Sequence, residues 1–547
     1  MSGRIPGAGN EPLRIQFITD VHYYARENGT EGPAYEKEES KSQQVIKDSD
    51  LVIKKGFDML CEDKSTDIVV LAGDTTRNGE YTSHEGIIAL LRELKAKGKR
   101  VYVITATHDY RGDGKGRGFD GDKVVDVPAV SDRQDLWDMY YEFGPSEAIS
   151  THRESLSYVV QLAPGYRLFA LNDDCNFKEE GERGSGFSDS CMQWIMDQLE
   201  DAKANDQYVI AMTHHPMVSP SPFYSIIGSG DMQKGHEKTR EIFADAGLNC
   251  MLTGHTHIHN IGYITTEKGN RFYDISCSAL IGCPPNYRNV TFDPKNAEIR
   301  VDTVTITDVP GIDTKGASFD KYMEDFFFGM IGRVVWAMGY DIDKLAEMTP
   351  AFSIPGEKVY KFKALIKPFG KFLNKLTFKK IWRVCKKESG LKKQDIEDIK
   401  DNKVVDFIIG LVKNLYCGDA PYTPDTREYK LTCGFLNVID SFLNTIHMPI
   451  SKFLKGAKSV RSLVEPLLWK DGYRDAEATL PLYPLYGDDN PAPAEMFEKK
   501  EYEDTVKKSK KGPLVLLLII LAVLLLLGIL AGIIALIVHL IILLAAK

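Results

Sequence analysis

The sequence predicts an α/β fold: a layered β-sandwich flanked by helices, followed by a helical C-terminal region and a C-terminal transmembrane helix. Three observations support this prediction. Within residues 1–308, short apolar runs of strand length alternate with stretches of helical periodicity. The pattern then becomes mainly helical, and the chain from Leu514 to Ala546 is almost entirely apolar.

Five of the apolar runs are predicted to be buried strands. Each has the length of a strand, and most are rich in β-branched residues. The five runs are Arg14–Thr19, Asp67–Ala72, Arg100–Thr105, Gln207–Thr213 and Leu248–Thr253. Two stretches between them, Glu85–Leu94 and Cys191–Leu199, have the periodicity of helices that cover the faces of a sheet.

Each of these runs ends in Asp or His residues. The five signatures are Asp20-Val21-His22, Gly73-Asp74, His108-Asp109, His214-His215 and Gly254-His255-Thr256-His257. In layered α/β folds, ligand sites collect in the loops at the carboxyl ends of the strands. We therefore expect these side chains to converge on one site.

The residue types in these signatures predict two bound divalent metal ions. Carboxylate oxygens and imidazole nitrogens bind Mn, Fe or Zn, and a single Asp can bridge two ions about 3.5–4 Å apart. One ion alone would not require so many ligands. A single motif such as Asp20-Val21-His22 more often forms a solvated turn, so the prediction depends on the occurrence of all five signatures together.

In the order and composition of these motifs, the sequence resembles the calcineurin-like metallophosphoesterase family. The family pattern is D-x-H, G-D, G-N-H-D/E, a His after a strand, and G-H-x-H, and the resemblance covers roughly residues 13–307. It implies a metallophosphoesterase-type sandwich. It also implies hydrolysis of a phosphoester by a hydroxide held between the two metals.

The resemblance further implies a role for each site residue. The implied ligands are Asp20, His22 and His257 for the first metal and His214 and His255 for the second, with Asp74 as the bridge. His108 would help the leaving oxygen depart, and Asp109 would fix the tautomer of His108. His215, Asn78 and Arg77 would support the ligands or face the substrate.

One position departs from the family pattern. Where the family has Asn in G-N-H-D, this chain has Thr107, so a hydroxyl replaces the carbonyl oxygen expected on the second metal. A neutral hydroxyl is a weaker ligand, which predicts weaker metal binding at the second site. Two hypotheses follow: an active phosphoesterase that cleaves a phosphodiester or nucleotide-type substrate, and a metal-binding membrane scaffold whose catalysis is weakened.

Length and composition indicate more than one domain. A chain of 547 residues is too long for one compact domain. Nine Cys residues without paired spacing argue against a disulfide framework, and a net charge of −9 without a recognisable reading module argues against nucleic acid as a partner. The predicted parts are a phosphoesterase domain (1–308), a helical region (309–470), a Pro-rich and charged linker (471–512) and a membrane anchor (513–547).

The C-terminal apolar run predicts a membrane anchor. Its only polar side chain between Leu514 and Ala546 is His539, and it exceeds the roughly 20 residues that cross a bilayer. The preceding Lys507-Lys-Ser-Lys-Lys511 is expected to stay cytoplasmic by the positive-inside rule. We therefore predict a single-pass, tail-anchored protein with a cytoplasmic catalytic domain; a hairpin near Gly528 and Gly532 is the alternative.

Residues 358–393 form a strongly basic segment, with 13 Lys or Arg residues and one acid, Glu388. Apolar residues recur at helical spacing from Phe362 to Leu376, which predicts an amphipathic helix with a kink at Pro368. The segment could bind an anionic membrane surface, attract an anionic substrate, or be a packed helix with a solvated charged face. The membrane anchor makes a lipid-linked phosphoester one candidate substrate beside a nucleotide.

Overall fold

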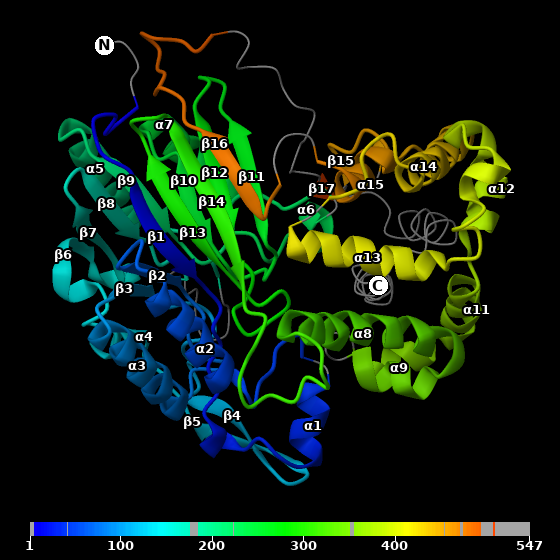
Figure 1. Cartoon of the computed structure of the whole chain (residues 1–547), viewed down its shortest axis with the longest axis horizontal. Coiled ribbons are helices and arrows are strands. Elements are labelled where there is room, and N and C mark those ends of the chain that lie inside the picture. Colours follow the sequence, from blue (N-terminus) through cyan, green and yellow to red (C-terminus); the bar gives the residue numbers. More distant parts are fainter. Residues whose placement is uncertain are drawn as a thin grey trace.

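The computed structural model describes residues 5–40, 42–174, 184–222, 224–349, 355–418, 420–452, 454–470, 474–493 and 507–508. These residues form two parts, an α/β sandwich and a lobe of helices beside it (Figure 1). The α/β fold class is therefore confirmed.

The first sheet of the sandwich has six strands in the order β16-β14-β13-β1-β2-β3. Their bounds are β1 Leu13–Ile18, β2 Ile68–Ala72, β3 Arg100–Ile104, β13 Asn286–Asp293, β14 Glu298–Thr305 and β16 Glu477–Pro481. Strands β1, β2 and β3 run parallel, so their carboxyl ends lie at one edge of the sheet. The other three strands add antiparallel pairs on the far side of β1.

The second sheet has seven strands in the order β11-β12-β10-β9-β8-β7-β6. Their bounds are β6 Ala148–His152, β7 Ser157–Ala163, β8 Tyr166–Ala170, β9 Tyr208–Met212, β10 Cys250–Thr253, β11 Asn260–Thr265 and β12 Arg271–Ser276. Strands β8, β9, β10 and β12 are parallel neighbours. All five predicted strands are confirmed, as β1, β2, β3, β9 and β10.

Apolar side chains from both sheets meet in the layer between them, where Phe17 and Leu252 are fully buried. Helices cover the outer faces: α2 (Ser49–Glu62) and α3 (Tyr81–Ala96) on the first sheet, α5 (Asp189–Ala204) and α7 (His236–Ala246) on the second (Figure 1). The two predicted helices lie within α3 and α5. The remaining elements of this part are α1 (Pro33–Glu39), α4 (Arg133–Met139), α6 (Tyr224–Ile227) and the hairpin β4 (Lys115–Asp120) and β5 (Lys123–Pro128).

The helical lobe has a core of its own, which includes Phe369, Ile381 and Leu436. Its elements are α8 Phe319–Tyr340, α9 Ile342–Met348, α10 Gly356–Lys361, α11 Lys363–Asn374, α12 Phe378–Ser389, α13 Val404–Cys417, α14 Arg427–Thr445, α15 Val460–Leu468, β15 Leu454–Lys455 and β17 Lys507–Lys508. The end of α13 contacts the sandwich, where the His259 N–H donates a 3.0 Å hydrogen bond to the Tyr416 carbonyl.

The predicted amphipathic helix is confirmed as α11, which runs through Pro368 without ending there. Pro368 lies inside α11, and the chain breaks instead at Phe362 and between α11 and α12. Long-range hydrogen bonds hold the second break, because the N–H groups of Phe378 and Lys379 donate to the carbonyls of Asn402 and Lys400 at 3.2 and 2.9 Å. These contacts involve residues distant in sequence, so the local pattern could not reveal them.

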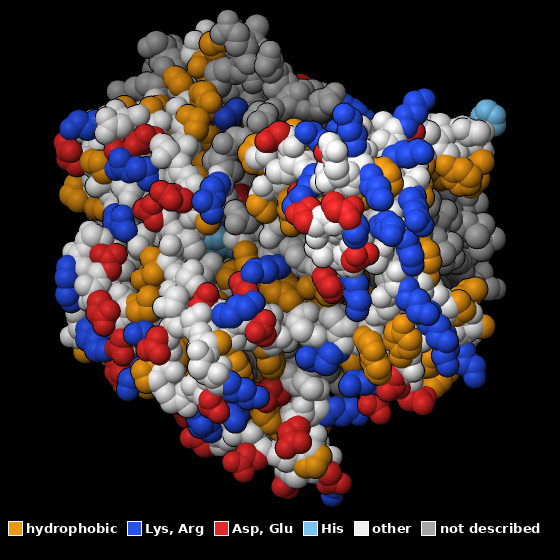
Figure 2. Space-filling view, turned by 45° about the vertical axis from the view of Figure 1, so that its right-hand side comes forward, with side chains coloured by type: hydrophobic (Ala, Val, Ile, Leu, Met, Phe, Trp, Pro, Cys, Tyr) orange, Lys and Arg blue, Asp and Glu red, His pale blue; other side chains and the backbone are white. Residues whose placement is uncertain are grey.

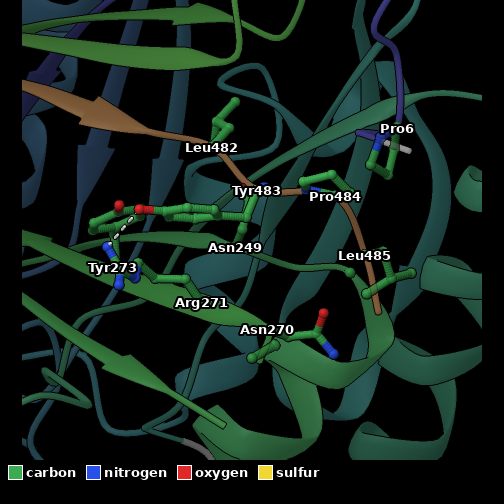
Figure 3. A pocket seen from close by; sticks show the side chains of 11 residues that line it. Pro6, Asn249, Asn270, Arg271, Tyr273, Leu482, Tyr483, Pro484 and Leu485 are labelled. Atoms are coloured by element: carbon green, nitrogen blue, oxygen red, sulfur yellow. Dashed lines mark hydrogen bonds between the residues drawn. The ribbon is translucent and has the colours of Figure 1, made fainter. Parts of the chain in front are cut away.

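The prediction that residues 471–512 form a linker is wrong for residues 477–481. Strand β16 pairs antiparallel with β14 at the edge of the first sheet, and Leu480 is fully buried in the sandwich core. Beyond β16, Tyr483 stacks on the Arg271 guanidinium at 4.6 Å, and the segment lines a small pocket at the amino ends of β10 and β12 (Figure 3). The burial of Leu480 outweighs the Pro-rich composition that suggested a tether.

Within the described residues, no helix has the length and apolar character needed to cross a membrane. The predicted membrane helix at 513–547 lies outside the described residues.

Candidate metal centre

The predicted Asp and His residues converge in the loops at the carboxyl ends of the parallel strands. Asp20 and His22 follow β1, Asp74 follows β2, His108 follows β3, His214 follows β9, and His255 and His257 follow β10. Two groups of potential metal ligands result. Both sheets contribute to the centre, which therefore exists only in the folded sandwich.

The first group consists of Asp20, His22 and His257, whose ligand atoms all lie within 4.8 Å of one another. His257 Nε2 is 3.2 Å from Asp20 Oδ1 and 3.2 Å from His22 Nε2. All three residues are buried. This spacing suits one divalent cation with two nitrogen donors and one oxygen donor.

The second group consists of Asp74, His214 and His255, again with all ligand atoms within 4.8 Å of one another. His214 Nε2 lies 3.2 Å from Asp74 Oδ2 and 3.2 Å from His255 Nδ1. Asp74 Oδ2 is also 3.7 Å from Nε2 of His22 in the first group. The Asp74 carboxylate therefore lies between the two groups.

An unpaired oxygen in the first group fits a cation. Among the described residues, Asp20 Oδ1 accepts no hydrogen bond although it is fully buried. The other oxygen, Oδ2, accepts hydrogen bonds from the Thr19 hydroxyl at 2.7 Å and from the His255 N–H at 3.0 Å. A buried carboxylate oxygen without a partner is costly, and a metal ion at this position would remove that cost.

The charges of the centre favour a bound positive charge. Burial raises the pKa of Asp20, but the charges of His214 and His257 outweigh it and hold this pKa well below its usual range. Burial likewise lowers the pKa of His214, but Asp74 and Asp20 outweigh it and hold this pKa well above its usual range. The same carboxylates would attract metal cations, whose binding displaces protons from the ligands.

The backbone is strained at the candidate ligands. Five of the six have positive φ angles: Asp20 (51°), His22 (41°), Asp74 (51°), His255 (65°) and His257 (56°). This conformation costs about 1–3 kcal/mol per non-glycine residue and is frequent at functional sites. Space is equally restricted, since a Cβ at Gly254 would clash with the side chains of Thr19 and Asp20.

Hydrogen bonds orient two of the imidazole rings. His214 Nδ1 lies 2.8 Å from the Ala72 carbonyl and donates to it, which leaves Nε2 free to bind a metal. The side-chain amide of Gln43 lies 2.6 Å from Nδ1 of His257. Sequence reasoning missed Gln43, because no local motif marks a residue so distant in sequence from His257.

His108 lies at the edge of the centre, with its ring 4.9 Å from that of His22. Its Nδ1 donates a 2.6 Å hydrogen bond to the Arg77 carbonyl. The Arg77 side chain bonds Glu38 and Gln44, at 3.2 and 2.9 Å. Arg77 therefore orients His108 through its backbone, while its guanidinium is occupied elsewhere.

The predicted role of Asp109 is wrong. Its carboxylate accepts hydrogen bonds from the Thr75 hydroxyl (2.6 Å), the Thr76 N–H (2.8 Å) and the Ala106 N–H (2.8 Å), and it forms none with His108. Asp109 thus ties together the loops after β2 and β3. Asn78 has a similar local role, because its amide donates to Glu80 at 3.0 Å.

Thr107 lies beside the second group. Its hydroxyl donates to Asp74 Oδ1 at 3.4 Å, and the N–H of His108 donates to the same oxygen at 2.9 Å. The side chain that replaces the family Asn therefore contacts the carboxylate located between the two groups.

Two acidic residues near His215, Asp173 and Asp174, were not predicted from the sequence. Asp173 accepts hydrogen bonds from the N–H groups of His214 and His215, at 3.3 and 3.2 Å. Burial raises the pKa of the neighbouring Asp174 to about 7. Both acids follow the buried strand β8, so their position at a strand end was a usable signal.

A two-sheet sandwich with paired Asp/His groups at its strand ends defines an α/β protein with a candidate two-metal centre. Residues 13–259 match the sequence model of the calcineurin-like phosphoesterases. The resemblance inferred from the motifs is thus confirmed. No curated protein matches the sequence.

Two solved structures are similar to the chain at low identity. A dimetal phosphatase from Danio rerio is 14% identical, with 54% of this chain and 96% of that chain covered and a TM-score of 0.39. A purple acid phosphatase, PPD1, from yellow lupin (Lupinus luteus) is 15% identical, with 55% and 53% covered and a TM-score of 0.35. The chain spans about half the length of the lupin protein.

Proposed function

We propose that the chain is a dinuclear metal-dependent phosphoesterase. In this proposal Asp20, His22 and His257 would hold the first metal and His214 and His255 the second, and Asp74 would serve both. The observation that carries the proposal is the position of Asp74, whose Oδ2 is 3.2 Å from His214 Nε2 and 3.7 Å from His22 Nε2. Mn, Fe and Zn all suit this nitrogen and oxygen donor set.

When bound, the metal pair would supply Lewis-acid chemistry, activating water and neutralising charge on the phosphoryl oxygens. His108 provides the complementary proton transfer. Because its Nδ1 donates to the Arg77 carbonyl, Nε2 is the nitrogen that takes up and releases a proton. A protonated His108 would donate from Nε2 to the leaving oxygen, a contribution of about 100-fold or more.

The charges around the centre support a phosphodiester or nucleotide-type substrate. The carboxylate of Asp173 adds negative charge beside His214 and His215, while the guanidinium of Arg77 is paired with Glu38. A diester carries one negative charge on the reacting phosphate, whereas a monoester carries up to two. The added carboxylate therefore disfavours a monoester more strongly than a diester.

We infer also that the enzyme is tail-anchored, with its catalytic part on the cytoplasmic side. Support comes from the sequence, in which the apolar run Leu514–Ala546 follows Lys507-Lys-Ser-Lys-Lys511. A lipid-linked phosphodiester would then be within reach of the centre. Protease protection of the full-length chain inserted into sealed vesicles tests this orientation.

The catalytic proposal is tested by turnover of an aryl phosphodiester by the full-length chain with Mn. Asp74→Asn is expected to reduce turnover to background, and His108→Ala to reduce kcat by about 100-fold or more. Matched controls are Asp197→Asn on the exposed face of α5 and His447→Ala on the helical lobe, which should retain activity.

The alternative function, a metal-binding membrane scaffold with weakened catalysis, rests on the replacement of the family Asn by Thr107. It predicts that the wild-type chain binds metal but shows no turnover on a panel of aryl, nucleotide and lipid phosphodiesters. Turnover that is equal in wild type, Asp74→Asn and His108→Ala would also remove the enzymatic proposal.

A further inference from the structure

We propose that the outward sides of α11 and α12 form a docking surface for an anionic lipid membrane. This surface, the basic face, is defined by Lys367 and Lys371 of α11, Lys375 directly after it, and Lys380, Arg383 and Lys387 of α12. The proposal concerns the contact between the helical lobe and a membrane, and it does not depend on phosphoesterase activity.

The inner sides of the two helices are fully used for packing. α11 packs against α8 and α12 against α14, with Phe369, Leu373 and Ile381 buried in the core of the lobe. A helix that serves only the core exposes mainly polar residues on its other side. Here, apolar side chains remain outside: Leu365 is 58% exposed, Phe372 39% and Val384 51%.

Helical spacing places these apolar side chains among the cations. Leu365 and Phe372 are seven residues apart and share one side of α11, adjacent to the row formed by Lys367, Lys371 and Lys375. On α12, Val384 lies between Arg383 and Lys387 on the exposed side. Figure 2 shows Lys and Arg side chains in a band along this side of the lobe, with apolar side chains among them.

The cations of the basic face lack carboxylate partners. Among the described residues, none of its Lys or Arg side chains lies within 4.0 Å of an acid, and Glu388 is the one acid between residues 358 and 393. Such a surplus of uncompensated positive charge attracts an anionic surface.

The chain reaches the helical lobe again immediately before its apolar C-terminal run. Strand β17 pairs with β15, with Leu454 opposite Lys508 and Lys455 opposite Lys507. Leu454 belongs to the core of the lobe. The apolar run that begins at Leu514 therefore follows a point on the same lobe that carries the basic face.

A lipid surface fits both features of the basic face. Lysines interact with anionic headgroups, while Leu365, Phe372 and Val384 can enter the boundary between headgroups and acyl chains. A nucleic acid would engage the charges but would offer no apolar layer for these three side chains. An anionic membrane is therefore the partner that matches both the charge and the apolar side chains of the basic face.

The test is hydrogen exchange of the full-length chain reconstituted in phosphatidylcholine vesicles with and without phosphatidylserine. Backbone amides of α11 and α12 are expected to exchange about tenfold more slowly when phosphatidylserine is present, and high salt should reverse this effect. Exchange in α5, on the sandwich, should be the same in both vesicles. Equal exchange of α11 and α12 in both vesicles would overturn the proposal.

Two variants separate docking from folding. Lys367→Glu/Lys371→Glu/Lys375→Glu should abolish the slowing, and Leu365→Ser/Phe372→Ser should reduce it. The matched control Lys54→Glu/Lys203→Glu/Lys238→Glu changes three exposed lysines of the sandwich and should leave it intact.

Turnover of a soluble aryl phosphodiester, measured in parallel, should be unchanged in all three variants. Loss of the slowing in the control as well would mean that total charge, not the basic face, governs binding. That outcome would contradict the proposal while leaving the proposed catalytic function untouched.

Discussion

The side-chain amide of Gln43 lies 2.6 Å from Nδ1 of His257, one of the candidate ligands of the first metal. The oxygen and nitrogen of an amide exchange places when it rotates by half a turn, so Gln43 can accept a hydrogen bond from Nδ1–H. That arrangement leaves His257 Nε2 free for the metal. Gln43 is thus a positioning residue for the first site.

Gln43→Ala should weaken metal binding at the first site by about 10–100-fold, the usual cost of removing a group that orients a metal-bound His. The metal concentration that gives half-maximal turnover should rise by the same factor. Gln193→Ala, on the exposed side of α5, is the control and should show no change. An unchanged metal requirement in Gln43→Ala would show that His257 needs no such partner.

Asp109→Asn should destabilise the protein. The carboxylate accepts hydrogen bonds from Thr75, Thr76 and Ala106. In Asn the side-chain NH₂ replaces one carboxylate oxygen, so it would face N–H or O–H groups that also donate. The free energy of unfolding, measured in urea, should fall by about 3 kcal/mol. If stability is unchanged and only the pH dependence of kcat shifts, Asp109 acts on His108 after all.

Thr107→Asn should tighten binding of the second metal. Thr107 lies next to Asp74, and its hydroxyl donates to Oδ1 of that residue at 3.4 Å. An Asn carbonyl oxygen at this position would add a stronger ligand to the second group. Calorimetric titration with Mn should show a lower dissociation constant for one of two sites; equal constants in both proteins would mean that Thr107 is not a ligand position.

Asp274 gives a prediction for the dependence of stability on pH. Burial raises its pKa to about 6, although Thr253 and the N–H groups of Val218 and Met217 donate to it. In the unfolded chain an Asp has a pKa of about 3.9. The folded protein therefore holds this proton more tightly, and its stabilising effect is complete below about pH 4 and lost as pH rises through about 6.

The comparison with Asp274→Asn isolates this effect. With metal chelated, the stability of wild type relative to the variant should decrease by up to about 3 kcal/mol between pH 4 and pH 7. Urea denaturation across this range measures it. A difference that stays constant or grows in favour of the wild type would show that Asp274 is already charged at low pH.

Strands and their terminal residues were predictable because each is encoded locally. Val69 and Leu71 in a short β-branched run identify β2, and Asp74 follows at once. Parallel strands bring such ends together, so the convergence of Asp74 and His214 followed from the pattern. These parts of the fold and of the centre needed no long-range information.

The features that sequence reasoning missed depend on distant partners. Gln43 contacts His257, which is more than 200 residues away in the sequence. Leu480 lies in β16, the edge strand of the sheet that contains β1. The carboxylate of Asp109 accepts hydrogen bonds from Thr75 and Thr76 on the neighbouring loop, and not from His108. None of these pairings has a signature in the residues that surround it.

The central claim is that two cations share the carboxylate of Asp74. Electron paramagnetic resonance of the full-length chain loaded with Mn tests it directly, because ions about 3.5–4 Å apart with a common carboxylate are magnetically coupled. We expect a coupled signal at two Mn per chain that becomes the signal of isolated ions in Asp74→Asn. A signal of isolated Mn in the wild type at two bound Mn per chain would contradict the claim.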